Sequence, residues 1–87
     1  MVELNVLKQR LADAFPDALH IEVEDLTGTQ DHFAAVVVTS EFENRSPIEQ
    51  HQLVYKALGE LMQGAVHALS LQTYTPGSWA ARGQSII

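Results

Sequence analysis

Histidine is the residue type with the clearest potential for chemistry in this chain. The four histidines are His20, His32, His51 and His67. A neutral imidazole is a good ligand for iron and for borderline divalent metals. Cysteine is absent, which excludes disulfides, a thiolate nucleophile and a metal cluster held by cysteines of this chain alone. Any metal must therefore be held by histidine, by carboxylates or by sulfur from a partner.

The charge balance and the motif content argue against other classes of function. Five Lys and Arg residues oppose eleven Asp and Glu residues, and the formal net charge of −6 repels phosphate backbones. The sequence has no nucleophile motif, no glycine-rich phosphate loop and no paired carboxylates in a plausible cleft, so we expect no enzymatic activity. No apolar run approaches the roughly 20 residues of a membrane span, and no export signal is visible. We therefore expect a cytoplasmic protein without a membrane partner.

The stretch from Ser46 to Gly64 specifies its own structure most completely. Ser46 and Glu49 have the spacing of a capping box, and Pro47 suits the first helical position. Apolar residues then recur at helical spacing, at Val54, Ala57, Leu58, Leu61, Met62 and Ala65. Together these signals predict a helix over residues 47–63 with one buried face, closed by Gly64.

The N-terminal part of the chain predicts a helix followed by two strands. Apolar spacing predicts a helix over residues 3–15, with Leu7, Leu11 and Phe15 turned inward. Residues 19–24 alternate strictly, which predicts a strand with Leu19, Ile21 and Val23 inside and His20, Glu22 and Glu24 in solvent. A β-branched run at residues 33–39 predicts a second, central strand. The short connection makes the pair an antiparallel hairpin, and Glu22, Glu24 and Asp25 are expected to be a solvated face rather than a metal site.

The C-terminal part completes the predicted sheet. Alternation from His67 onward predicts a third strand, and a crossover through the long helix would set it parallel to the second strand. Pro76 can begin a short last helix that contains Trp79, and residues 83–87 are expected to be a frayed tail. We predict one α+β domain over residues 1–87, with a three-stranded mixed sheet packed against helices.

Four separated pieces of this sequence resemble the BolA-like protein family. They are Phe42 with Ser46, His51 ahead of Leu53-Val54-Tyr55, His67-Ala68-Leu69, and Thr75-Pro76 followed by Trp79. The resemblance runs from about residue 19 to residue 80. It implies the element order αββααβα, similar to a type II KH domain, in which the first helix of the αα pair is a short turn around residues 40–42.

The resemblance also implies a metal site and a partner. In BolA-like proteins the histidine that matches His67 helps to ligate a [2Fe–2S] cluster shared with a monothiol glutaredoxin. His32 is a candidate second ligand, with Asp31 as an alternative oxygen donor. Sulfur would come from the glutaredoxin and its glutathione, so no cofactor is expected in the isolated chain. The implied function is a non-enzymatic adaptor in iron homeostasis, and a homodimer is left open.

Each histidine also has a purely structural interpretation, as an alternative to a role in metal binding. On the pattern alone, His67 is a strand-end histidine that packs, and His32 is an exposed loop residue. His51 falls within the apolar face of the long helix, which predicts a hydrogen-bonded core histidine. His20 alternates with buried positions and is expected to face solvent without a role.

The alternative function is a KH-like, nucleic-acid-binding transcriptional regulator. The family has been linked to transcriptional control, and its loop before the long helix occupies the place of the KH backbone-gripping loop. Here that loop contains Asn44, Arg45 and Ser46, with one basic residue and no GXXG motif. Asn44 stands where the family usually has glycine, and Asn tolerates positive φ. Gln50 and Gln52 flank His51 in place of the usual arginines, which removes positive charge.

Overall fold

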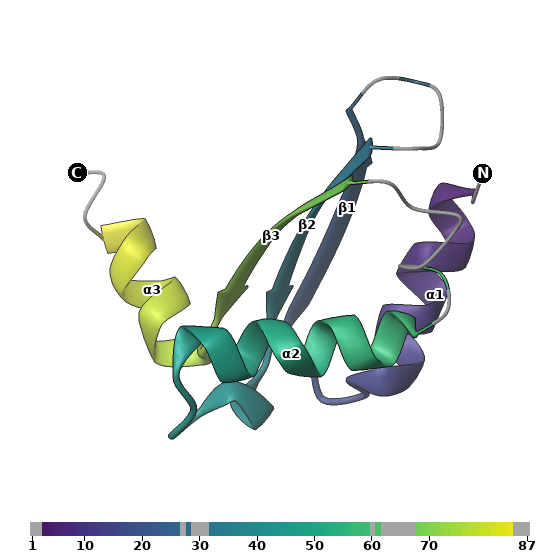
Figure 1. The fold of residues 1–87 in the computed structure, drawn as a ribbon. Helices are drawn as coiled ribbons and strands as arrows, with labels where there is room; N and C mark the ends of the chain where they lie inside the picture. Colours follow the sequence, from purple (N-terminus) through teal and green to yellow (C-terminus); the bar gives the residue numbers. More distant parts are fainter. Residues whose placement is uncertain (1–2, 27, 29–31, 60, 62–67, 85–87) are drawn as a thin grey trace.

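The computed structural model describes residues 3–26, 28, 32–59, 61 and 68–84, with side chains described for all of these except residues 68 and 82–84. The element order is α1 (Leu4–Ala14), β1 (His20–Asp25), β2 (His32–Val38), the 3₁₀ turn η1 (Ser40–Phe42), α2 (Pro47–Leu58), β3 (Ala68–Tyr74) and α3 (Pro76–Gln84) (Figure 1). This order confirms the predicted α+β arrangement, including the short turn around residues 40–42. Within the described residues, no helix is long and apolar enough to cross a membrane.

The three strands form one mixed sheet in the order β1-β2-β3. β1 pairs with β2 in antiparallel register, from His20 opposite Val38 to Asp25 opposite Phe33. β3 pairs with β2 in parallel register, and His32 lies opposite Ala68 at the start of both strands. The predicted central position of β2 and the predicted parallel third strand are both confirmed.

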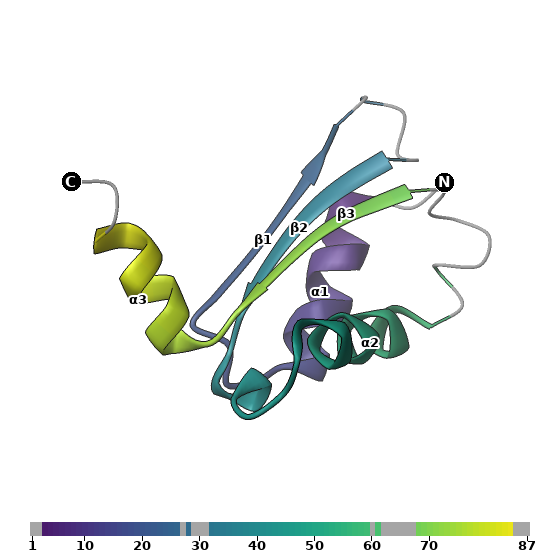
Figure 2. The same cartoon turned by 60° about the vertical axis from the view of Figure 1, so that its left-hand side comes forward.

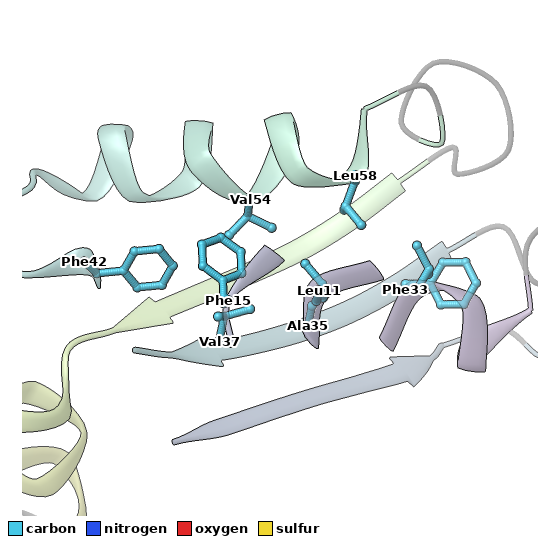
Figure 3. Packing of buried hydrophobic residues seen from close by; sticks show 9 residues of the cluster. Leu11, Phe15, Phe33, Ala35, Val37, Phe42, Val54 and Leu58 are labelled. Carbon is cyan, nitrogen blue, oxygen red and sulfur yellow. The ribbon is translucent and has the colours of Figure 1, made fainter. Parts of the chain in front are cut away.

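Two helices cover one face of the sheet, and the core lies between them and the strands. In Figure 2, α1 and α2 lie on one side of the sheet, whereas α3 projects on the other side from the end of β3. Because strand side chains alternate, every second residue of β2 points toward α1 and α2. The buried cluster contains Leu7, Leu11, Phe15, Phe33, Ala35, Val37, Phe42, Val54 and Leu58 (Figure 3). Phe15 and Phe42 meet edge to face, with ring centroids 5.5 Å apart.

The start of α2 is confirmed, but its end is not where the sequence suggested. The Ser46 hydroxyl accepts the Glu49 N–H at 3.2 Å, and a Glu49 carboxylate oxygen accepts the Ser46 N–H at 3.0 Å. The helix ends at Leu58, and Gly59 takes a positive φ of 53°. The Arg10 guanidinium donates to the Leu58 carbonyl at 3.5 Å, which places a cation at the negative end of the helix dipole.

The residues predicted to finish the long helix fall in a part of the chain that is not described. Met62, Gly64 and Ala65 lie outside the described residues. Leu61 is described, and it packs partly buried against the core cluster.

The predicted bounds of α1 (3–15), β1 (19–24) and β2 (33–39) are each off by one residue at both ends, and the last helix runs further than predicted. Leu19, predicted to face the core, precedes β1 and is 67% exposed, whereas Ile21 and Val23 pack against the core as predicted. The last helix runs to Gln84, so residues 83 and 84 are helical rather than part of a frayed tail. Residues 85–87 lie outside the described part of the chain.

Candidate functional site

The candidate metal centre begins at His32, where the β1–β2 connection enters β2. His32 is exposed, and its carbonyl accepts the Leu26 N–H at 2.9 Å. On the other side of the connection, the Asp25 carboxylate accepts the Gly28 N–H at 2.9 Å, and Gly28 takes a φ of 73° that suits glycine. Backbone bonds therefore fix the position of His32 while its imidazole stays accessible. Asp31, the alternative donor, lies outside the described residues.

The strand register pairs His32 with the residue that follows His67, the other predicted ligand. His32 is paired with Ala68 across the β2–β3 ladder, in which neighbouring strands lie about 4.8 Å apart. Ala68 directly follows His67 in the sequence. His67 itself lies outside the described residues, so its role as a ligand stays a prediction.

The described residues do not form a complete metal site by themselves. Among them, no group of three or more histidine or carboxylate side chains is placed to hold a metal ion. Glu22 and Glu24 are exposed on β1, as expected for a solvated strand face. A metal at His32 would therefore need ligands from the undescribed segments or from a partner.

His51 is not the buried core residue that its position in the apolar stripe predicted. It is half-buried, and its ring meets the Tyr55 ring edge to face with centroids 6.4 Å apart. The fully buried residues Val54 and Leu58 mark the centre of the helix face that packs on the sheet. His51 lies at the edge of this face, beside the partly exposed Tyr55, because helical spacing spreads a stripe over a wide arc.

His20 has a packing role that sequence reasoning missed. Its ring stacks on Trp79 with centroids 5.4 Å apart and an interplanar angle of 22°, and Nε2 lies 3.6 Å from a Glu22 carboxylate oxygen. Tyr74 meets the same indole ring, with centroids 5.2 Å apart. These contacts hold α3 against the end of the sheet. No local signal could have predicted them, since His20 and Trp79 are far apart in the sequence.

The loop proposed for nucleic-acid binding is a well-defined turn. Asn44 takes a φ of 64°, which confirms that asparagine can replace glycine at this position. The Arg45 Nε–H donates to the Glu41 carbonyl at 3.2 Å, and the Ser46 hydroxyl is used by the helix cap. The backbone hydrogen bond from Ser46 is the largest cause that lowers the pKa of Glu49, followed by the bond to the Ser46 hydroxyl and the Arg45 charge.

Gln50 anchors this loop to the sheet, a role that the sequence analysis did not assign. Its side-chain NH₂ donates to the carbonyls of Phe42 at 3.2 Å and Arg45 at 3.0 Å. Its carbonyl oxygen accepts the Thr73 hydroxyl at 2.7 Å. The signal available was its place in the first turn of α2, where a polar side chain can reach back to the preceding loop.

An open groove of about 250 Å³ lies beside the loop, between α2, η1 and the end of α1. Phe15, Leu53 and Ala57 provide an apolar lining, and the charged lining residues are Glu41, Arg45 and Lys56. Two cations and one carboxylate make this groove locally basic on an acidic protein.

Comparison with known proteins decides the family. Residues 3–78 match the family described as BolA-like protein. The chain belongs to the BolA-like protein family. The match covers most of the chain, including every described strand and most of the helical layer, and it confirms the resemblance found in the sequence.

Relatives and solved BolA structures agree with this assignment. The chain is 46% identical to mouse BolA-like protein 1 over 57 residues, which cover 66% of this chain but only 42% of the mouse protein. It is 31% identical to the DNA-binding transcriptional regulator BolA of Haemophilus influenzae, over 93% of this chain and 84% of that protein. The crystal structure of a Bol-like protein from Babesia bovis superposes with a TM-score of 0.85 at 27% identity, covering 95% of both chains.

Proposed function

We propose that this BolA-family chain is a non-catalytic, cytoplasmic adaptor that pairs with a monothiol glutaredoxin and holds or passes on a [2Fe–2S] cluster in iron homeostasis. The supporting observation is the ladder end at which exposed His32 pairs with Ala68, the residue after His67. The register therefore brings His32 opposite the residue that follows His67, which supports a shared site at this end of the sheet.

The donor set of the chain fits a shared cluster better than one held alone. Imidazoles can replace two thiolates on one iron of a two-iron cluster, while thiolates serve the other iron. This chain has no cysteine, so in our proposal His32 and His67 are its ligands, and glutaredoxin with its glutathione supplies the sulfur. Asp31 is the alternative donor next to His32. The cluster is cargo carried between partners.

The test is to mix the protein with a monothiol glutaredoxin that carries its cluster and glutathione. A stable complex on gel filtration and a changed visible absorption and circular dichroism spectrum are expected. Gel filtration of the chain alone reports whether it forms a homodimer. An unchanged cluster spectrum together with the absence of a complex would refute the adaptor function.

Histidine variants locate the ligands in the same assay. His67→Ala is expected to leave the free fold intact and to change the spectrum and stability of the mixed complex, and His32→Ala should do the same if it is the second ligand. His51→Ala is the matched control, because His51 lies on α2 and is expected to leave the cluster spectrum unchanged. If only His51→Ala changed the spectrum, the site would move to the long helix.

A second candidate is nucleic-acid binding through the loop at residues 43–46. The name of the Haemophilus relative, DNA-binding transcriptional regulator BolA, and the basic groove beside Arg45 favour it. The net charge of −6 opposes it. Retention of duplex DNA that falls with salt and is lost in Arg45→Ala/Lys56→Ala would support this function. Equal retention by the double variant would contradict it.

A further inference from the structure

In the described part of the chain, one face of the sheet carries no helix over most of its length. α1 and α2 pack on the opposite face, and α3 leaves the end of β3 on the uncovered side (Figure 2). Strand alternation and the pairing register place His20, Val38 and Tyr74 at one end of this side, His32 at the other end, and six residues between them. We call these six residues the open face: Glu22 and Glu24 from β1, Ala34 and Val36 from β2, and Ser70 and Gln72 from β3.

The open face has an ordered chemical layout across its three strands. The β1 row is acidic and exposed, the β2 row is apolar and half-buried, and the β3 row is neutral and polar. Trp79, stacked on His20, forms an aromatic wall at the end where α3 begins. The surface therefore offers an apolar floor flanked on one side by carboxylates, which is more than a solvated acidic strand.

The described cations lie on the helical side of the molecule, which also carries carboxylates such as Asp13 and Glu49. Four of the five cations have described side chains, and they belong to α1, α2 and the loop before α2: Lys8, Arg10, Arg45 and Lys56. Among the described side chains, the titratable groups on this side are Glu22 and Glu24, with His20 and Tyr74 at the aromatic end and His32 at the opposite end. The fifth cation, Arg82, belongs to α3, and its side chain lies outside the described part of the structure. Among the described side chains, no Lys or Arg forms an ion pair with Glu22 or Glu24. The face is electrostatically complementary to a positively charged occupant.

We infer that the open face docks an extended, basic segment of a partner protein whose arginine or lysine residues alternate with other residues. Glu22 and Glu24 are two positions apart on one strand, a spacing of about 6.8 Å. An extended segment that runs along β1 presents its alternate side chains at the same spacing. Their aliphatic stems can cover Ala34 and Val36 while the charged ends reach the carboxylates.

This inference goes beyond the adaptor function and does not depend on it. The cluster assay measures the visible absorption and circular dichroism of the iron–sulfur cluster, whereas the docking assay uses the protein without a cluster. A negative result in the cluster assay therefore does not contradict the docking inference, and a negative result in the docking assay does not contradict the adaptor function.

The probe is a synthetic peptide with three alternating arginines, acetyl-(Ala-Arg)₃-amide, titrated at low salt and at about pH 8, where imidazole is neutral. Trp79 is the only tryptophan of the chain, so its fluorescence reports binding at the end of the face, and calorimetry gives the Kd independently. Saturable binding that weakens with salt is expected. A peptide with the same composition but contiguous arginines should bind more weakly.

Matched charge variants separate docking from the field of the whole protein. Glu22→Gln/Glu24→Gln should raise the Kd about fivefold, the effect of two exposed ion pairs. Glu3→Gln/Glu43→Gln removes the same charge at exposed positions outside the open face, and its Kd should stay within about twofold. Equal weakening in the two double variants, equal affinity for the contiguous peptide, or no saturable binding would each overturn the inference.

Discussion

Replacing Gln50 with alanine would test whether one side chain holds the loop before α2 against the sheet. The amide of Gln50 bonds to the carbonyls of Phe42 and Arg45, and its oxygen accepts the hydroxyl of Thr73. Gln50→Ala removes all three bonds at once. The loop carries Arg45, so loss of this anchor also bears on the shape of the basic groove.

The expected cost follows from how exposed each bond is. The bond to the Arg45 carbonyl is exposed, and water can replace it with little loss. The bonds to Phe42 and Thr73 are partly buried, and two such bonds contribute about 2 kcal/mol together. Alanine offsets a few tenths of this loss, roughly 0.3 kcal/mol, through its higher helix propensity. Since a chain of this length is stable by about 4 to 13 kcal/mol in total, the loss is readily measurable.

Urea unfolding followed by far-UV circular dichroism measures the effect against a matched control. Gln52→Ala changes the same residue type on the same helix at an exposed position, and it should alter the free energy of unfolding by no more than about 0.5 kcal/mol. A double-mutant cycle with Thr73→Val should give a coupling energy of about 1 kcal/mol. If Gln50→Ala behaves like Gln52→Ala, or if the coupling is zero, the assigned network does not hold the loop.

Three other substitutions test separate parts of the structure. Leu58→Ala should lower the free energy of unfolding in urea by about 2 to 5 kcal/mol, because Leu58 is 1% exposed. Leu19→Ala is the control, since Leu19 is 67% exposed and its loss should change the free energy of unfolding little. A loss below about 1 kcal/mol for Leu58→Ala would mean that the core face of α2 is misplaced. The hydrogen bond from the Ser46 backbone lowers the folded-state pKa of Glu49, so its stabilising contribution is present above the ordinary glutamate pKa of about 4.3 and is lost as pH falls through the lowered value. Unfolding measured from about pH 6 to about pH 2 should therefore show a steeper acid loss for the wild type than for Glu49→Gln, and parallel profiles would contradict this cause. Asn44→Ala should cost about 1 kcal/mol in thermal unfolding because alanine is strained at a φ of 64°, while Asn44→Gly should be close to neutral; equal costs would argue against the left-handed turn.

The parts of the fold that sequence reasoning predicted are those with local signals. The capping box at Ser46 and Glu49 needs only four consecutive residues, and the alternation at Ile21 and Val23 needs only a strand. The predicted end of α2 was wrong because either Gly59 or Gly64 can adopt the positive φ that ends a helix, and the sequence does not distinguish them. Which glycine ends the helix depends on the packing around Leu58 and on the carbonyl bond from Arg10, both of which are tertiary.

In the candidate site, too, features with local sequence signals were predicted and features that depend on tertiary contacts were not. The place of His32 where the hairpin loop meets the second strand was anticipated from the hairpin pattern, and its role as a ligand stays a prediction. Its pairing with Ala68 depends on the register of two distant strands. The burial of His51 was overestimated because periodicity gives the direction of a face and not its width. The stack of His20 on Trp79 and the anchoring by Gln50 join residues that no short pattern connects.

The parallel pairing of β2 with β3 also bears on the order in which the chain folds. His32 and Ala68 are separated by 36 residues, twice the 18 residues between His20 and Val38 in the antiparallel pair. Closing the longer loop costs more chain entropy, so the hairpin is expected to form early and the edge strand β3 to dock last. Backbone amides of β3 should then exchange with solvent hydrogen sooner than those of β2. The end of the sheet at which His32 pairs with Ala68 is therefore expected to be completed last in folding and to be lost first when the domain begins to open.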